Sequence, residues 1–233
     1  MADPAPDSAV ATSAQSAAAA ADSSVTTHTP LHCRWTLWYD NPRFAPAGTL
    51  WKDNLKRCGS FQSVEAFWRC YNNLKPPSQL SLNSNYHIFR EGILPTWEDP
   101  TNIDGGKFVY TMQKKISKTG VCDESWMFTV LAVIGETLDL DGDQVVGAVV
   151  SIRKSQDRIA LWIKSSDKHI CRNIGLRWKK ALDIHKVNLK FQVHRDVFSV
   201  RLREDEWYCL ARQVPWRHYA TIRSKQAFQV ILY

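Results

Sequence analysis

The stretch ILPTWEDPTNIDGGK, from Ile93 to Lys107, carries the densest information in the chain. It places two carboxylates, Glu98 and Asp99, directly after Trp97. Its prolines and its Gly-Gly pair exclude a helix interior and a central strand, so it is a loop at the surface. An indole beside a carboxylate suits a flat, electron-poor ring with N–H donors, such as protonated or methylated guanine. The alternative is that Trp97 folds back over the core, because tryptophans are highly buried on average.

Composition favours a globular protein with a polyanionic partner. The chain has 233 residues, enough for one domain with a substantial core, and ten of them are tryptophans. Its net charge is +7. The first thirty residues contain three aspartates and no Lys or Arg, so the remainder carries +10. A basic body of this kind favours binding to nucleic acid.

The six cysteines show neither C-x-x-C pairs nor His/Cys ligand spacing, which predicts free thiols in a reducing compartment, cytoplasm or nucleus. We see no membrane-spanning stretch and no signal peptide. Residues 1–28 are rich in Ala, Ser and Thr, and we expect them to form a disordered tail. Residues 29–233 then form one domain.

Apolar periodicity predicts strands at 33–39, 85–90, 107–114, 144–153, 158–164 and 187–193, with another candidate at 227–232. It predicts helices at 63–73, 124–136 and 168–182, and a polar turn at 117–123. In the first helix, Val64 and Trp68 form one stripe and Phe67 and Tyr71 form a second. One stripe faces the core, which leaves the other for a partner. Hairpins alternating with separated helices predict an α+β fold, a curved and mostly antiparallel sheet backed by three helices on its convex face.

At this point the sequence resembles the eukaryotic translation initiation factor 4E family, which binds the mRNA 5′ cap. The matching segments include TPLHCRWTLWYD, SVEAFWRCYNNL, GILPTWEDPTNIDGGKF and VVGAVVSIRKSQDRIALW, in an order that fits the family from about Pro30 to Asp196. The resemblance implies a non-enzymatic, monomeric cap-binding protein that acts in translation initiation without a cofactor or a metal.

The resemblance also assigns the base site. Trp51 and Trp97 match the two tryptophans that sandwich 7-methylguanine, and stacking on aromatic side chains contributes about 1–3 kcal/mol per base. Glu98 matches the carboxylate that accepts from the guanine N1–H and the exocyclic amine, which rejects adenine. Trp162 matches the indole at the N7-methyl group. Its alternative is a plain core residue, because Leu161 and Ile163 flank it.

Arg153 and Arg158 match the basic pair that holds the cap phosphates, and Lys107 matches a further basic residue near them. Ser155 departs from the family, which usually has a second lysine there, so phosphate binding is expected to be weaker or rearranged. Lys154 is an extra local charge, and such charges are usually solvated.

The other face implied by the resemblance takes a partner helix bearing Tyr-x-x-x-x-Leu-apolar, found in scaffold and repressor proteins. The residues that match this groove are Pro30, Val64, Trp68, Met127 and Leu131. Phe128 stands where the family commonly has a glutamate, and Thr29 replaces the usual His. Both departures put the identity of the partner in doubt.

Residues around 197–225 form a basic, aromatic insertion relative to the family. One hypothesis is that they contact nucleotides beyond the cap, and the alternative is extra packing on the fold. The divergence looks similar to that of kinetoplastid paralogues, which meet a hypermethylated cap, so that ligand is a second candidate.

Three other interpretations remain open at this stage. A cap-processing enzyme would need a metal site, but the loop with Asp139, Asp141 and Asp143 lacks the Gly and Glu of a calcium-binding EF-hand. A cap-binding repressor would differ only in its partners. A general single-stranded RNA binder would show no preference for methylated guanine.

Overall fold

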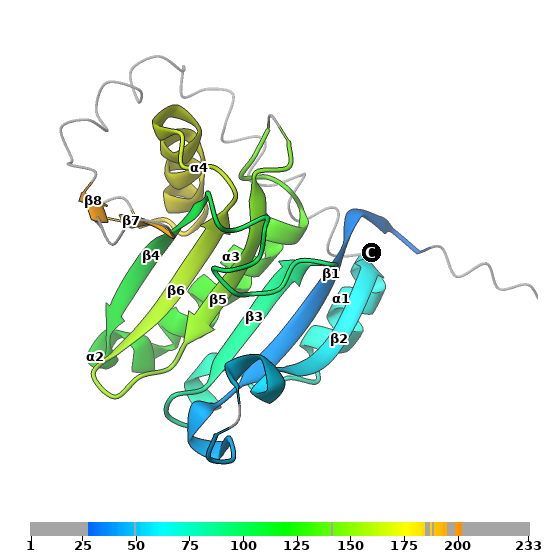
Figure 1. The fold of residues 1–233 in the computed structure, drawn as a ribbon, viewed down its shortest axis with the longest axis vertical. Coiled ribbons are helices and arrows are strands. Elements are labelled where there is room, and N and C mark those ends of the chain that lie inside the picture. The colour runs from blue at the N-terminus through cyan, green and yellow to red at the C-terminus, as the bar shows by residue number, and fades with distance from the viewer. Residues whose placement is uncertain are drawn as a thin grey trace, which may run out of the picture.

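The computed structural model describes residues 28–48, 50–140, 142–184, 187 and 189–194, together with the backbone of 199–201. In the described residues, eight strands form one antiparallel sheet in the order β2-β1-β3-β5-β6-β4-β7-β8 (Figure 1). The strands are β1 (Pro30–Asp40), β2 (Lys56–Ser63), β3 (Asn85–Arg90), β4 (Gly106–Gln113), β5 (Val145–Ser151), β6 (Gln156–Ile163), β7 (Lys190–Val193) and β8 (Ser199–Arg201).

Three longer helices pack on the convex face of the curved sheet, as the α+β prediction required (Figure 1). They are α1 (Val64–Tyr71), α3 (Cys122–Ile134) and α4 (Lys168–Ala181). Ser63 caps α1 by accepting from the Ala66 amide at 3.2 Å, and Asp167 caps α4. The shorter helical turns are η1 (Pro42–Phe44), η2 (Trp51–Asn54), η3 (Pro77–Gln79), α2 (Lys114–Ile116) and η4 (Ser117–Val121).

The pleat of the strands gives the sheet two different faces. Along β6, Ile159, Leu161 and Ile163 enter the core under the helices, while Trp162 joins a smaller cluster on the opposite, concave face. Strand β3 alternates in the same way, and Phe89 lies in the concave cluster. The main core is filled by large rings that are almost fully buried: Trp35, Phe67, Phe108, Trp126 and Trp178.

Two local predictions were wrong. No strand was predicted at Lys56–Ser63, where β2 pairs with β1 along the outer edge of the sheet. Only Phe61 of this strand is buried, so the sequence shows no apolar alternation there. The stretch 117–123 is helical rather than a polar turn, because Ser117 donates to the buried Asp157 and Gly120, at φ 93°, bends the chain into α3.

The prediction of two separate stripes on α1 was also wrong. Val64 and Phe67 are both buried against the sheet, whereas Trp68 and Tyr71 are half-buried. The core therefore takes one residue from each stripe, at i and i+3, and the helix presents Trp68 and Tyr71 together at its border with solvent.

Several predictions lie outside the described residues: the tail except for His28, the strand at 227–232, and the 197–225 insertion except for the backbone of β8. Among the residues that the structure describes, no helix is long and apolar enough to cross a membrane. The five cysteines in those residues are all free thiols, as predicted.

Candidate functional site

The loop between β3 and β4 holds Trp97 and Glu98 at its exposed tip. Asp99 closes the loop from inside, because its carboxylate accepts from the backbone amides of Leu94 and Thr101, each at 2.9 Å. Asn102, fully buried, donates to the carbonyls of Leu94 at 2.9 Å and Thr96 at 2.7 Å. The loop is thus held by its own polar side chains, and the Trp97 ring remains 55% exposed. The alternative that Trp97 folds back over the core is wrong.

Trp51 is the first residue of the η2 turn. This turn and the loop between β3 and β4 both lie on the side of the sheet opposite the helices (Figure 1). Its ring is 38% exposed, and it meets the His87 ring edge-on with centroids 5.8 Å apart. Its indole Nε1–H donates to the Asp40 carboxylate at 3.2 Å. The Trp51 ring is therefore tethered at its nitrogen and free on its outer part.

The Asp40 carboxylate is completely buried and accepts from three side chains. Asn85 Nδ2 contacts both of its oxygens, at 3.0 and 3.1 Å, and His87 Nε2 lies 2.6 Å from Oδ1. Burying a carboxylate is costly unless it is paired and hydrogen-bonded, and these contacts meet that need. The same Asn85 side chain accepts from Arg153, through Oδ1 and Nη2 at 2.8 Å.

Arg153 lies at the end of β5, where the chain turns into β6. Its Nη1 donates to the carbonyls of Ser84 and Ile152, at 3.3 and 3.0 Å. Burial, and then the charge of Arg158, lower the pKa of the Arg153 guanidinium. The turn itself is fixed by the buried Asp157, which accepts from the Arg153 amide at 3.0 Å and from Lys114 Nζ at 2.6 Å.

Lys107 and Trp162 are cross-strand partners on β4 and β6, and both lie on the concave face. Trp162 is 7% exposed and packs edge-on against Phe89, and its buried indole nitrogen has no partner within the described part of the chain. Burial, and then the charge of Arg158, lower the pKa of Lys107. Trp162 is therefore well buried, as the core alternative predicted, yet it faces the open side of the sheet.

The structure thus gathers the predicted cap residues on one face. Trp51, Trp97 and Glu98 are exposed, Arg158 is exposed on β6, and Arg153, Lys107 and Trp162 are more deeply set. Ser155 and Lys154 are exposed in the turn between β5 and β6. Indole faces, a carboxylate and cations in this arrangement fit a purine with N–H donors and a phosphate tail.

The predicted partner residues lie on the helix side. Trp68 contacts Phe67 and Tyr71, with ring centroids 4.9 and 6.0 Å apart. Pro30 is exposed, Met127 and Leu131 are half-buried, and Val64 is 4% exposed. We call these five residues, Pro30, Val64, Trp68, Met127 and Leu131, the partner face. Val64 supports this face from beneath more than it forms its surface.

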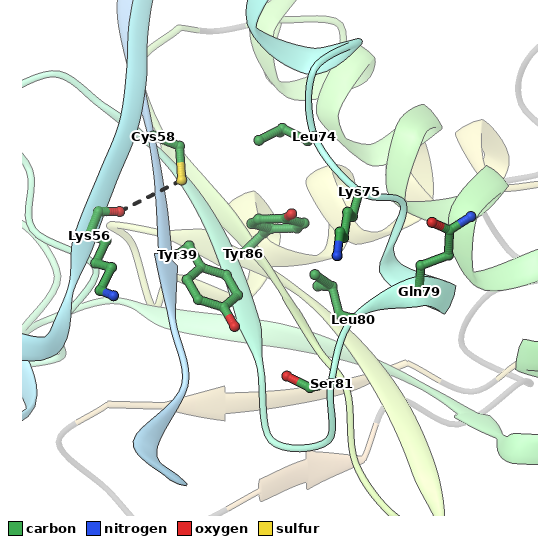
Figure 2. Close-up of a pocket in the computed structure, with 9 residues that line it drawn as sticks. All are labelled: Tyr39, Lys56, Cys58, Leu74, Lys75, Gln79, Leu80, Ser81 and Tyr86. Atoms are coloured by element: carbon green, nitrogen blue, oxygen red, sulfur yellow. Dashed lines mark hydrogen bonds between the residues drawn. The ribbon is translucent and has the colours of Figure 1, made fainter. Parts of the chain in front are cut away.

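Two hollows in the described part of the chain are lined by residues outside the tryptophan site. The first has a volume of about 370 Å³, and its lining includes Tyr39, Tyr86, Leu74 and Lys75 (Figure 2). A second hollow, of about 480 Å³, shares Leu74, Lys75 and Tyr86 and continues to Met127. The two hollows therefore adjoin each other, and the second reaches the partner face at Met127.

Sequence reasoning missed the buried set Asp40, Asn85 and His87. A partial signal was present, because His87 stands between Tyr86 and Ile88 in a predicted strand. The sequence does not reveal that β1 and β3 are adjacent, and their register alone brings Asp40 opposite Asn85 and places His87 near it.

Known protein families and proteins match most of this chain. The family model described as eukaryotic initiation factor 4E matches residues 30–206. Eukaryotic translation initiation factor 4E-1 of Hordeum vulgare is 39% identical over 188 residues, which cover 80% of this chain and 84% of that protein. Eukaryotic translation initiation factor 4E of Candida glabrata is 44% identical over 155 residues, 66% of this chain and 72% of that protein.

Solved structures agree. Ascaris suum eIF4E-3 in complex with an m7G cap is 33% identical, with a TM-score of 0.69 over 76% of this chain and 97% of that chain. The same protein in complex with an m2,2,7G cap has a TM-score of 0.67 at 35% identity, over 72% of this chain and 92% of that chain. Caenorhabditis elegans eIF4E-3 in complex with the 4E-binding protein Mextli has a TM-score of 0.68 at 34% identity, over 75% and 100%. The chain belongs to the eukaryotic initiation factor 4E family.

Proposed function

We propose that this chain binds the 7-methylguanosine cap of mRNA and acts in translation initiation through a scaffold protein, as a binding protein and not as an enzyme. One observation carries the proposal. Trp51, Trp97 and Glu98 are exposed, and they belong to a turn and a loop on the side of the sheet that the helices leave open (Figure 1). A translation factor of this kind works in the cytoplasm.

In the proposed complex the methylated base stacks between the Trp51 and Trp97 rings. Methylation at N7 gives the base a positive charge, so its attraction to two indole faces exceeds that of neutral guanine. Glu98 accepts from N1–H and the exocyclic amine, which adenine cannot supply together. Trp162, beneath this site on the concave face, contacts the methyl group.

Arg153, Arg158 and Lys107 hold the phosphates. Burial lowers the pKa of both Arg153 and Lys107, and a bound anion offsets that effect by supplying an opposite charge. Ser155 adds no charge to this group, so Lys154 is the remaining cation in the turn. The phosphate site is thus centred on the strand residues rather than on the tip of the turn.

On the helix side, we propose that the partner face takes a helix bearing Tyr-x-x-x-x-Leu-apolar. An aromatic ring beside aliphatic side chains is a common anchor for such helices. A second candidate is a cap-binding repressor, and Phe128 favours it, because this half-buried ring replaces the charge expected beside the partner helix. Binding to a scaffold fragment and to a repressor fragment, measured side by side, separates the two roles.

Quenching of tryptophan fluorescence by 7-methyl-GTP and by GTP tests the cap proposal directly. We expect strong preference for the methylated nucleotide in the wild type, and loss of that preference in both Trp51→Ala and Glu98→Gln. Trp35→Phe is a control, because Trp35 is buried in the main core away from the open face. Equal, weak quenching by both nucleotides in the wild type would refute the proposal.

The trimethylated cap is a second ligand to measure. Dimethylation of the exocyclic amine removes both of its N–H donors, which leaves Glu98 only the N1–H. We therefore expect weaker binding of the trimethylated cap analogue, by about tenfold for one lost hydrogen bond to a charged group. Equal affinity for both caps would show that Glu98 does not contact the exocyclic amine.

A further inference from the structure

We infer that Asp40 is a positioning residue of the cap site, with one buried carboxylate fixing both the stacking ring of Trp51 and, through Asn85, the phosphate-binding guanidinium of Arg153. The inference rests on the proposed function. It adds Asp40 and Asn85 to the tryptophans, the glutamate and the cations of the proposed site. It starts from the position of Asp40 as the last residue of β1, on the concave face.

The first step is the Trp51 tether. The Trp51 ring belongs to a short helical turn and contacts the His87 ring, with centroids 5.8 Å apart. Its Nε1–H donates to Asp40 Oδ2 at 3.2 Å, and this is a charge-assisted hydrogen bond. A bond at the nitrogen fixes the rotation of the indole about its side chain, and therefore fixes the plane against which a base stacks.

The second step is the link to the phosphate side. Asp40 receives both contacts from the Asn85 amide nitrogen, which orients the amide so that its oxygen faces Arg153. Arg153 is thereby held by Asn85 and two backbone carbonyls, with its charge next to the buried anion. The negative charge of Asp40 favours the charged form of Arg153.

His87 contacts both Asp40 and Trp51. Its Nε2 lies 2.6 Å from Asp40 Oδ1, while its buried Nδ1 has no hydrogen-bond partner among the residues that the structure describes. The ring therefore directs its one satisfied nitrogen to Asp40 and its edge to Trp51. His87 thus helps to enclose the carboxylate and packs against the Trp51 ring.

A thermodynamic cycle tests the Trp51 tether. The ligand is 7-methylguanosine, which has no phosphate, and the variants are Asp40→Ala, Trp51→Phe and Trp97→Phe with their combinations. Phenylalanine still stacks but has no N–H to donate. We expect Asp40→Ala to weaken binding about tenfold in the wild type and in Trp97→Phe, and less than about twofold in Trp51→Phe.

The phosphate link is measured as the gain in affinity from 7-methylguanosine to 7-methyl-GTP. We expect Asp40→Ala and Asn85→Ala each to reduce this gain severalfold. In an Arg153→Gln background, neither substitution should change the gain further. Asp40→Asn is a second variant that keeps the shape of the side chain. It retains one acceptor oxygen for three donors, so a smaller loss with the same dependence on Trp51 is expected.

A structural role alone would give different results. Thr129→Val is the matched control, because Thr129 Oγ1 accepts from the indole nitrogen of the buried Trp178 at 3.0 Å on the helix side. We expect it to lower the melting temperature without changing nucleoside affinity. If Asp40→Ala and Asp40→Asn weaken binding equally in the wild type and in Trp51→Phe, the inference is overturned.

A different result would show that the proposed function itself is wrong. A wild type that binds guanosine and 7-methylguanosine equally well contradicts cap recognition, whereas the Asp40–Trp51 cycle is read with whichever nucleoside binds. In the free protein, ¹⁵N-labelled tryptophan gives a further measurement. The Trp51 indole N–H should exchange with solvent severalfold faster in Asp40→Ala, and an unchanged rate would overturn the tether.

Discussion

The ammonium group of Lys107 lies 5.2 Å from the centroid of the Trp162 ring, its cross-strand partner. The Trp162 ring is proposed to contact the methylated base, and Lys107 is proposed to bind the phosphates. The contact between them therefore connects the base-binding and phosphate-binding parts of the site. Burial, and then Arg158, lower the pKa of this lysine from the ordinary value of 10.5. It therefore loses its charge at a lower pH than an exposed lysine.

The first prediction concerns pH. Because anionic phosphate binds the charged lysine, the preference for 7-methyl-GTP over 7-methylguanosine should fall as pH rises through the lowered pKa of Lys107. The ratio of the two affinities removes any titration of the base, which both ligands share. Lys107→Arg should keep the ratio nearly constant across the same range. A falling ratio in that variant would assign the effect to another group.

The second prediction concerns acid stability. His194 packs on Trp162 with ring centroids 4.3 Å apart, and burial, then Lys107, lower its pKa to about 4 from the ordinary 6.5. The folded state binds this proton less readily than the unfolded state does. The stabilisation is thus complete above pH 6.5 and is lost as pH falls from 6.5 toward 4.

Denaturant unfolding at several pH values checks this expectation. The free energy of unfolding of the wild type should decline across that interval more than that of His194→Asn. Identical slopes for the two proteins would mean that His194 titrates at its ordinary pKa in the folded state.

The third prediction separates the two faces of the sheet. Trp68→Ala removes the ring that packs on Phe67 and Tyr71. We expect it to weaken binding of a Tyr-x-x-x-x-Leu-apolar peptide by at least about 30-fold, the loss typical of a central aromatic anchor. Affinity for 7-methyl-GTP should change less than twofold. Calorimetry with both ligands measures this, and a parallel loss of both would contradict independent faces.

The fourth prediction concerns the hinge points of the Trp97 loop. A Cβ on Gly105 would come within 2.1 Å of the Ile163 carbonyl oxygen, so Gly105→Ala must displace the end of the loop. Gly92, at the other end, has φ +86° and open space around it. Gly92→Ala should therefore cost stability, about 1–2 kcal/mol, and Gly105→Ala should in addition weaken cap binding about tenfold. Equal cap affinities for the two variants would show that the loop adapts.

Much of the fold was predictable because the apolar periods are strong. The helix that became α4 carries Ile174 and Trp178 at helical spacing, and Asp167 precedes it as a cap. Strand β3 was predicted at its observed bounds, since all but one of its residues are buried. Strand β2 was not, because an edge strand with one buried side chain leaves no periodic mark.

The candidate site divides in the same way. Trp97 and Glu98 stand together in one loop, so their chemistry is readable locally. The connection of Trp51 to Arg153 through Asp40 and Asn85 is not, because it depends on sheet register between segments far apart in the chain. Local sequence indicates which groups are present, while tertiary pairing decides which of them meet.

The strand order has a consequence for the synthesis of the protein. Strand β3 lies between β1 and β5, and β4 lies between β6 and β7, so four of the seven pairings in the described sheet join strands that are not consecutive in the chain. Such topologies fold slowly, since long loops must close before the contacts that stabilise them form. Asp40 emerges early from the ribosome and Trp162 late. The nascent chain therefore has no complete ligand site until β6 has left the exit tunnel, and binding cannot begin before that point in synthesis.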